Sequence, residues 1–342
     1  MVPYALPFRE PYVTSRGRLD RREMVLLRLH FETGVTGLGE AVPLSLRGGT
    51  ALDEVVRELV AWGRLAVASA QTPSTTGMSA PARVATSMAL SDAEAREKEV
   101  PLHTLLAGGS PAEPVLCNAT LTSATPEGVL EQAETWADDG FTVFKLKLGT
   151  GDDVAVVESL REGLGPDIKI RIDANGSWTF DEAAAILSAI EPFGIELAEQ
   201  PVLGLPGMAA LREKTTIPLV ADEDVFDVSS ARRAAEMHAC DAVTVKLSKI
   251  GRLKAGLDGH LPTYLSSALD GPVGIAAAAH VAQILNADPP WDTVAHGLAT
   301  ERLFSASIAD QGPLLDGAFL PVPSGNGLGI TIDEGALEAH RL

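Results

Sequence analysis

Two lysines separated by one residue lie in an apolar stretch, Phe144-Lys145-Leu146-Lys147-Leu148-Gly149. Alternate residues of a β-strand point to the same side, so Lys145 and Lys147 would project together from a strand. The other side chains of the stretch favour burial. Two ammonium groups at the end of a buried strand, inside a barrel or a cleft, are well placed to act on a bound substrate.

Three carboxylates and a third lysine follow later apolar runs. The motifs are Asp173-Ala174-Asn175, Glu199-Gln200-Pro201, Asp222-Glu223-Asp224 and Lys246. From Lys147 to Lys246, successive positions are 23 to 26 residues apart, which is the length of one strand and one helix. Oxygen ligands of this kind suit Mg²⁺, and also Mn²⁺, with water or substrate in the remaining positions. Without a cation, the three carboxylates would repel and raise one another's pKa.

Strands and helices alternate from Val115 onward, and they must position these residues. Thr125, Thr179 and Asp227 are suitable N-caps for helices over 126–139, 180–190 and 229–237. Repeated alternation predicts a parallel sheet, and eight strands favour a closed barrel with its site at the C-terminal ends of the strands. The connection from 251 to 261 leaves room for only a short helix. The expected strands are 115–121, 143–148, 168–174, 195–200, 219–222, 242–247, 262–267 and 293–298.

The second and sixth strands of an eight-stranded ring lie on opposite sides. A substrate carboxylate bound to Mg²⁺ would therefore have Lys147 near one face of its α-carbon and Lys246 near the other. Such an arrangement favours removal of the α-proton, with positive charge stabilising the enediolate that forms. The sequence thus predicts catalytic roles for Lys147, Lys246 and Lys145, and metal ligation by Asp173, Glu199 and Asp222.

The first 112 residues have a different pattern of expected strands and helices. Strands are expected over 24–29 and 35–41, and helices over 52–60 and 82–98. We therefore expect three parts, which are an α+β capping domain over 1–112, the barrel over 113–300, and a C-terminal segment, 301–342, that returns to the capping domain.

Composition excludes several classes of function. The hydrophobic fraction of 46% is that of a folded protein, and the net charge of −19 argues against nucleic acid or an anionic membrane as partner. Cys117 and Cys240 are expected to be reduced core residues. No signal peptide and no run of the ~18 apolar residues needed to span a membrane is evident, so a cytoplasmic location is expected.

Together these motifs resemble the enolase superfamily, in its muconate-lactonizing-enzyme-like subgroup with lysines on the second and sixth strands. The resemblance covers nearly the whole chain, including Gly37-Leu38-Gly39-Glu40-Ala41 in the capping part. It implies a modified (β/α)₇β barrel, a Mg²⁺-dependent enzyme acting on a small carboxylate, and a homo-oligomer. Asn175 and Glu223, which belong to these motifs, are expected to face the substrate. The expected seventh strand, 262–267, has no histidine, unlike the mandelate-racemase-like subgroup.

Peripheral residues resemble those of o-succinylbenzoate synthases, the dehydratases of menaquinone biosynthesis. The similar stretches are Cys117-Asn118-Ala119-Thr120, Thr14-Ser15-Arg16-Gly17 with Arg22, and Ser266-Ser267-Ala268. The resemblance implies that Arg16, Ser266 and Ser267 contact the substrate, and that serine and backbone N–H groups after the seventh strand receive a carboxylate.

Two features keep other activities open. Lys246-Leu247-Ser248-Lys249 looks more like the pattern of cycloisomerases and epimerases. His296-Gly297-Leu298-Ala299 lacks the Asp-x-Asp that holds a substrate ammonium in dipeptide epimerases. The alternatives to o-succinylbenzoate synthase are therefore a muconate-type cycloisomerase and an N-succinylamino acid racemase or dipeptide epimerase. A non-catalytic binding protein on the same fold is a further alternative, against which the intact set of ligands and lysines argues.

Overall fold

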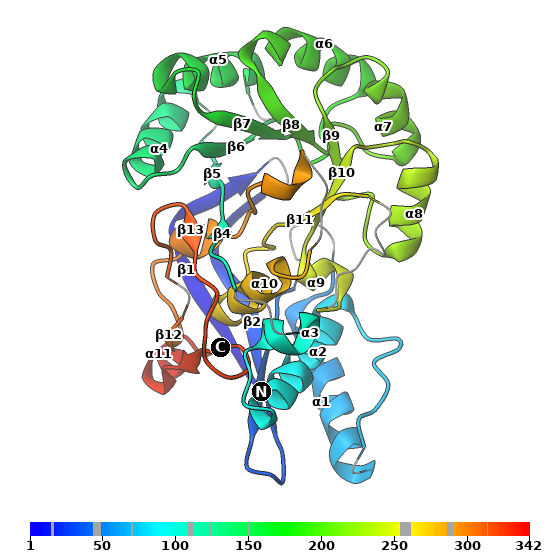
Figure 1. Ribbon diagram of the computed structural model, residues 1–342, viewed down its shortest axis with the longest axis vertical. Coiled ribbons are helices and arrows are strands. Elements are labelled where there is room, and N and C mark those ends of the chain that lie inside the picture. The colour runs from blue at the N-terminus through cyan, green and yellow to red at the C-terminus, as the bar shows by residue number, and fades with distance from the viewer. Residues whose placement is uncertain are drawn as a thin grey trace.

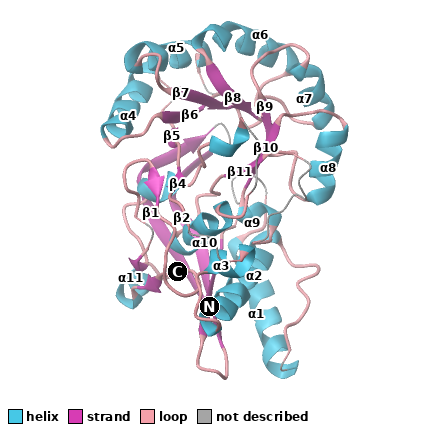
Figure 2. Cartoon of the chain, viewed as in Figure 1, coloured by secondary structure: helices cyan, strands magenta, loops and turns pink. Residues whose placement is uncertain are grey.

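The computed structural model describes residues 1–14, 17–43, 49–69, 71–108, 112–123, 125–149, 151–253, 261–285, 290–312 and 314–342. Figures 1 and 2 show a curved sheet backed by helices, and beside it a second part made by the first hundred residues and the last thirty.

The second part contains a three-stranded antiparallel sheet in the order β1-β2-β3, with β1 at Val2–Thr14, β2 at Gly17–His30 and β3 at Thr36–Ala41. Helices α1 (Leu52–Ser69), α2 (Ala80–Glu97) and α3 (Leu102–Ala107) follow. The predicted strands and helices of this region are confirmed. β2, α1 and α2 are longer than their apolar patterns suggested, and β3 begins one residue later than expected. Strand β1 was not predicted, because three prolines within it obscure the alternating pattern of a strand.

Glycines 37 and 39 explain how β3 packs on α2. A Cβ atom at Gly37 would lie 1.9 Å from the carbonyl oxygen of Ala89, and one at Gly39 would lie 2.0 Å from that of Ala85. The strand backbone therefore rests directly on the helix backbone, an approach that a larger residue would prevent.

The barrel sheet is parallel, in the order β11-β10-β9-β8-β7-β6-β5. Its strands are β5 (Ala119–Leu121), β6 (Val143–Lys147), β7 (Lys169–Asp173), β8 (Ile195–Glu199), β9 (Leu219–Ala221), β10 (Ala242–Val245) and β11 (Thr263–Leu265). Its helices are α4 (Pro126–Asp138), α5 (Asp153–Leu164), α6 (Phe180–Ile190), α7 (Leu205–Arg212), α8 (Val228–Glu236), α9 (Leu247–Ile250) and α10 (Pro272–Ala282). The side chains of Thr125, Thr179 and Asp227 all accept the predicted N-cap hydrogen bonds.

Two predicted strands differ from the structure. The segment 115–121 is not one strand, because β4 (Val115–Leu116) pairs antiparallel with β13 (Phe319–Leu320) and only β5 joins the barrel. The segment 293–298 forms no strand, but it closes the ring through the bridges Cys117–His296 and Ser266–Gly297. The chain leaves the sheet at Leu298 (φ −109°, ψ −1°) and enters a 3₁₀ turn, Ala299–Leu303, so His296 alone pairs with the segment on one side and Gly297 alone with that on the other.

The C-terminal segment returns to the first sheet, as predicted. It contains β12 (Ala309–Gln311), β13, β14 (Thr331–Ile332) and α11 (Glu334–Ala339). The backbone N–H of Ala5 donates to the carbonyl of His340 at 2.9 Å, and that of Leu342 donates to Pro3 at 3.0 Å. Arg28 on β2 forms an ion pair with Glu334 at 2.6 Å.

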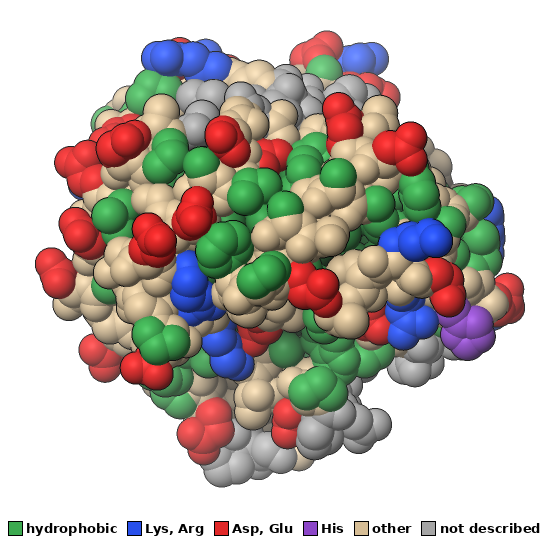
Figure 3. Space-filling view, turned by 90° about the horizontal axis from the view of Figure 1, so that it is seen from above, with side chains coloured by type: hydrophobic (Ala, Val, Ile, Leu, Met, Phe, Trp, Pro, Cys, Tyr) green, Lys and Arg blue, Asp and Glu red, His purple; other side chains and the backbone are tan. Residues whose placement is uncertain are grey.

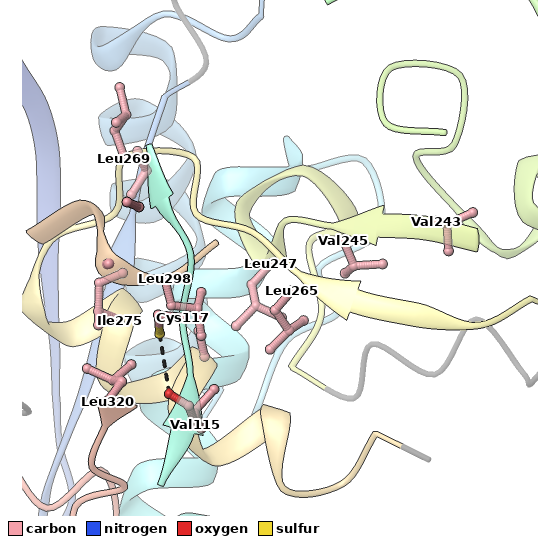
Figure 4. Packing of buried hydrophobic residues seen from close by; sticks show 14 of the residues in the cluster. Val115, Cys117, Val243, Val245, Leu247, Leu265, Leu269, Ile275, Leu298 and Leu320 are labelled. Carbon is pink, nitrogen blue, oxygen red and sulfur yellow. Dashed lines mark hydrogen bonds between the residues drawn. The ribbon is translucent and has the colours of Figure 1, made fainter. Parts of the chain in front are cut away.

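The apolar core runs continuously from the barrel into the capping part. Figure 4 shows Val243, Val245, Leu247 and Leu265 from β10, α9 and β11, with Cys117, Leu298 and Leu320 in the same cluster. Helix α10, whose residues from 272 to 281 are all buried, lies inside this junction. Cys117 and Cys240 are both buried and unpaired, as expected.

The surface carries the acidic charge. On the face drawn in Figure 3, acidic side chains are scattered widely and basic ones are fewer. Within the described residues, the structure has no helix that is both long enough and apolar enough to cross a membrane.

Candidate active site

The predicted catalytic residues meet at the carboxyl ends of the barrel strands, where they border a cavity of about 320 Å³. Lys145 and Lys147 come from β6, while Lys246 follows β10, four strands away in the sheet order. Lys145, Lys147 and Lys246 all line the cavity. The opposed placement of Lys147 and Lys246 that the barrel topology predicts is therefore present.

The two lysines of β6 share one carboxylate but differ in their second contact. Lys145 Nζ lies 2.8 Å from Asp173 and 2.6 Å from Glu199. Lys147 Nζ lies 2.5 Å from Asp173 and donates to Asn175 Oδ1 at 3.2 Å. Lys147 thus lies one layer nearer the mouth, as expected for the residue closer to the end of the strand.

On the other side of the cavity, two lysines contact Asp222. Lys246 forms a short ion pair with Asp222 Oδ2, and Lys249 Nζ lies 3.1 Å from Oδ1. Lys249 also donates to the backbone carbonyl of Asp222. Lys249 belongs to α9, which begins directly after Lys246, so one helical turn brings both ammonium groups to the same carboxylate.

The three expected metal ligands, Asp173, Glu199 and Asp222, are all fully buried. As the side chains stand, no three His, Cys, Asp or Glu residues in the described ranges are close enough to hold a metal. Each carboxylate instead points an oxygen at a lysine. Glu199 Oε1, however, is buried and makes no hydrogen bond within the described structure. A buried, unpartnered carboxylate oxygen beside two further carboxylates fits a hard divalent cation.

The charges of the cluster set its protonation. Burial alone would raise the pKa of Asp173, but the ammonium groups of Lys145 and Lys147 outweigh it and lower that pKa. Burial and the neighbouring charge of Asp173 raise the pKa of Glu199. Burial favours the neutral amine of Lys147, yet the charge of Asp173 raises its pKa overall.

The predicted substrate contacts lie in different places. Asn175, Glu223, Ser266 and Ser267 line the cavity, and Asn175 Nδ2 donates to Glu223 at 3.2 Å. Arg16 lies outside the described residues.

The turn after β11 corrects one expectation. Its backbone N–H groups at Ser266, Ser267 and Ala268 are already bonded to Val245, Gly297 and Asp270. The hydroxyl of Ser267 donates to Asp270 Oδ2 at 2.9 Å. The Asp270 turn and the sheet therefore use these three N–H groups, and the hydroxyls of Ser266 and Ser267 stay as proposed substrate contacts.

Three further side chains belong to the site although sequence reasoning gave them no role there. Lys249 lines the cavity beside Lys246. Thr300 also lines it, and its buried hydroxyl has no hydrogen-bond partner in the described part of the chain. Tyr264 on β11 donates to Glu199 Oε2 at 2.9 Å. The spacing Lys246-x-x-Lys249 could have indicated Lys249 from the sequence. Thr300 and Tyr264 could not be found in this way, because their roles depend on contacts between distant segments.

Family models match almost the full length of the chain. Residues 1–107 match the N-terminal domain of the mandelate racemase / muconate lactonizing enzyme family, and residues 128–336 match the enolase C-terminal domain-like family. The chain belongs to the enolase superfamily. It falls in the muconate-lactonizing-enzyme-like subgroup, as its motifs indicated.

Named relatives within this superfamily catalyse different reactions. The o-succinylbenzoate synthase of Thermobifida fusca is 35% identical over 207 residues, which cover 58% of this chain and 63% of the relative. The L-Ala-D/L-Glu epimerase of Bacillus subtilis is 28% identical, and the match covers 95% of this chain and 94% of the epimerase. A dipeptide epimerase from Cytophaga hutchinsonii, solved with Mg and a dipeptide, is 26% identical with a TM-score of 0.86, covering 99% of this chain and 98% of that one.

Proposed function

We propose that this enolase-superfamily enzyme removes a proton α to a substrate carboxylate in a Mg²⁺-dependent reaction, with Lys147 as the base and Lys246 as the opposing cation. The observation that carries the proposal is the pair of lysines facing one cavity from β6 and from the end of β10, above three buried carboxylates. Asp173, Glu199 and Asp222 would hold the metal, which when bound would supply positive charge beside the reacting carboxylate.

Lys147 acts as a base only in its neutral form. Burial and the adjacent ammonium of Lys145 both favour that form, while the charge of Asp173 opposes it. If a bound cation offsets the charge of Asp173, burial and the charge of Lys145 dominate and lower the pKa of Lys147. Lys246 stays on the far side of the substrate, where its charge stabilises the enediolate. Asn175, which accepts from Lys147 at 3.2 Å, keeps the amine directed at the cavity.

The specific reaction that we propose is dehydration of 2-succinyl-6-hydroxy-2,4-cyclohexadiene-1-carboxylate to o-succinylbenzoate, in which Lys147 takes the α-proton and returns a proton to the departing hydroxide, so that water leaves. The cavity wall supports an anionic substrate, because Arg22 lines it and Glu223 is the one acidic side chain among the described lining residues. Apolar groups at Leu19, Phe226 and Leu269 line the same cavity and suit the ring and methylenes of such a substrate. The o-succinylbenzoate synthase among the relatives adds support.

An epimerase or racemase is the second candidate. Lys249 and the long match to the Bacillus epimerase favour it. In that reaction, Lys147 and Lys246 would take and return a proton on opposite faces of the α-carbon. The absence of an acidic residue at 296–300 gives a substrate ammonium no partner on that wall, which favours the dehydratase. A muconate-type cycloisomerase shares the same lysines and remains a third activity to assay. We place the enzyme in the cytoplasm, in keeping with its two unpaired cysteines, and expect a homo-oligomer.

The test is an assay of the purified protein with Mg²⁺ and the cyclohexadiene substrate, following aromatisation by absorbance. We expect o-succinylbenzoate to form, and Lys147→Ala to lower kcat by about 10²- to 10⁴-fold, the usual contribution of a general base. Lys169→Ala is the matched control, since Lys169 is an exposed lysine at the opposite end of a neighbouring strand. Inactivity of the wild type here, with turnover of a dipeptide or a muconate, would reject the dehydratase assignment. Solvent deuterium at the α-carbon without dehydration would identify the epimerase.

A further inference from the structure

Tyr264 lies inside the barrel below the cavity floor, with 3% of its surface exposed. It is on β11, between Thr263 and Leu265, and its hydroxyl donates to Glu199 Oε2 at 2.9 Å. The same oxygen accepts from Lys145 at 2.6 Å. Two donors from different strands therefore meet on one oxygen of Glu199, whereas Oε1 has no hydrogen-bond partner among the described residues.

Arg171 contacts the face of the Tyr264 ring. The Arg171 guanidinium carbon lies 5.5 Å from the ring centroid, within the range of a cation–π contact. Arg171 is itself fixed, since its Nε lies 2.5 Å from Glu196 and its Nη1 donates to the carbonyl of Ala295 at 2.5 Å. The ring of Tyr264 therefore packs on an arginine that is fixed by a partly buried ion pair and by the segment that closes the barrel.

We infer that Tyr264 is a positioning residue for the metal ligand Glu199, an inference that rests on the proposed metal-dependent function. With Oε2 committed to Tyr264 and Lys145, the carboxylate cannot rotate without breaking two buried hydrogen bonds. Oε1 is then the oxygen left to face a cation. Hydrogen bonds to ligating carboxylates orient them, and removing such a partner commonly weakens metal affinity 10- to 100-fold.

Tyr4 offers a matched control within the same chain. It is also fully buried, and its hydroxyl also donates to a buried carboxylate, Glu40 Oε2, at 2.7 Å. Neither residue of that pair lines the cavity. Tyr4→Phe and Tyr264→Phe each delete one oxygen and its hydrogen bond to a buried carboxylate, so they match in chemistry and differ in their relation to the proposed ligands.

The experiment is a titration of Mn²⁺ against wild type, Tyr264→Phe and Tyr4→Phe, with free Mn²⁺ measured by electron paramagnetic resonance. We expect the Kd of Tyr264→Phe to rise about 10- to 100-fold and that of Tyr4→Phe to change less than about twofold. Equal Kd values for wild type and Tyr264→Phe would overturn the inference while leaving the proposed function intact. A wild type that binds no Mn²⁺ would overturn the metal-dependent function, and the inference with it.

A second measurement covers the case in which Tyr264→Phe does not fold. The chain has three tyrosines, so wild type labelled with 3-fluorotyrosine gives three ¹⁹F resonances, which Tyr4→Phe and Tyr12→Phe assign by deletion. On addition of Mg²⁺ the Tyr264 resonance should shift and the Tyr4 resonance should not. A Tyr264 resonance that stays in place while Mn²⁺ binds to the wild type would contradict a role beside the metal.

Discussion

Lys145 and Lys147 project from the same face of β6, yet they make different contacts and have different proposed roles. Lys145 bridges Asp173 and Glu199 and is nearly buried, whereas Lys147 bridges Asp173 and Asn175 at the cavity wall. The first neutralises charge within the carboxylate cluster. The second is the one whose amine reaches a substrate from the strand end.

This difference predicts unequal effects of two alanine substitutions. Lys147→Ala should lower kcat by about 10²- to 10⁴-fold because the base is lost. Lys145→Ala should lower kcat less, and its main effect should be weaker metal binding, because Glu199 Oε2 loses one of the two hydrogen bonds that orient that carboxylate. The measurements are kcat, and the Mg²⁺ concentration for half-maximal activity. Comparable losses of kcat in the two variants would show that Lys147 is not the acting base.

At the level of single residues, the sequence was most informative where chemistry and strand period coincide. Lys145, Asp173, Glu199 and Lys246 could be placed because each follows an apolar run at a regular interval. Tyr264 and Thr300 could not, since a tyrosine or threonine in a buried segment is ordinary. Tyr264 gains a role because β11 brings it to Glu199 on β8. Thr300 gains one because the 3₁₀ turn brings it to the cavity.

Among the elements, β3 and α2 show how a pair of glycines sets a helix–strand contact. The sequence placed Gly37 and Gly39 in an expected strand over 35–41. The structure adds the reason for the spacing, since alternate residues of β3 face the carbonyls of Ala89 and Ala85 on successive turns of α2.

Gly37→Ala tests this contact. Its new Cβ would lie 1.9 Å from a backbone oxygen, so strand and helix must separate, and we expect a loss of about 2 kcal/mol or more of unfolding free energy. Gly63→Ala is the matched control, because Gly63 lies within α1 with no atom within 4 Å of the added Cβ. That substitution should stabilise the protein by roughly 0.5–1 kcal/mol through helix propensity. Urea unfolding of both variants measures the two effects, and equal stabilities would refute the packing argument.

Helix starts were predictable because an N-cap is a local signal, as Thr125, Thr179 and Asp227 show. The ends of strands were harder to predict than the starts of helices. The stretches at 115–121 and 293–298 have apolar patterns typical of strands, but pairing depends on neighbours far away in the sequence. Val115–Leu116 pairs with β13 from the C-terminal segment, and no local sequence pattern predicts that pairing.

Across the whole molecule, Glu40 joins the capping part to the barrel. It lies on β3, is fully buried, and accepts hydrogen bonds from Tyr4 and from the backbone N–H groups of Gly271 and Gly274 at the start of α10. Burial, together with the charge of Asp270, raises the pKa of Glu40 to about 8. The folded protein therefore holds a proton that the unfolded chain releases near pH 4.5.

A pH dependence of stability follows from Glu40. Because its pKa is higher in the folded state, the associated stability is complete below about pH 4.5 and is lost as pH rises toward 8. Glu40→Gln stays neutral and keeps an oxygen for the N–H groups, so its unfolding free energy should fall less between pH 5 and pH 8 than that of the wild type. Urea unfolding at several pH values measures both slopes. Parallel slopes would show that Glu40 is ionised in the folded protein throughout this range.

The closure of the barrel has a consequence for how new activities arise. Most of the ring is tied by strand ladders, which fix the register of every side chain along them, but the seam at His296 and Gly297 is held by two bridges. Just beyond it, the 3₁₀ turn Ala299–Leu303 brings Thr300 to the cavity wall without a ladder partner. Substitutions there alter the wall that meets the substrate without disturbing strand pairing. The seam is therefore where selection, natural or in the laboratory, can change the substrate while the lysines and carboxylates stay in place.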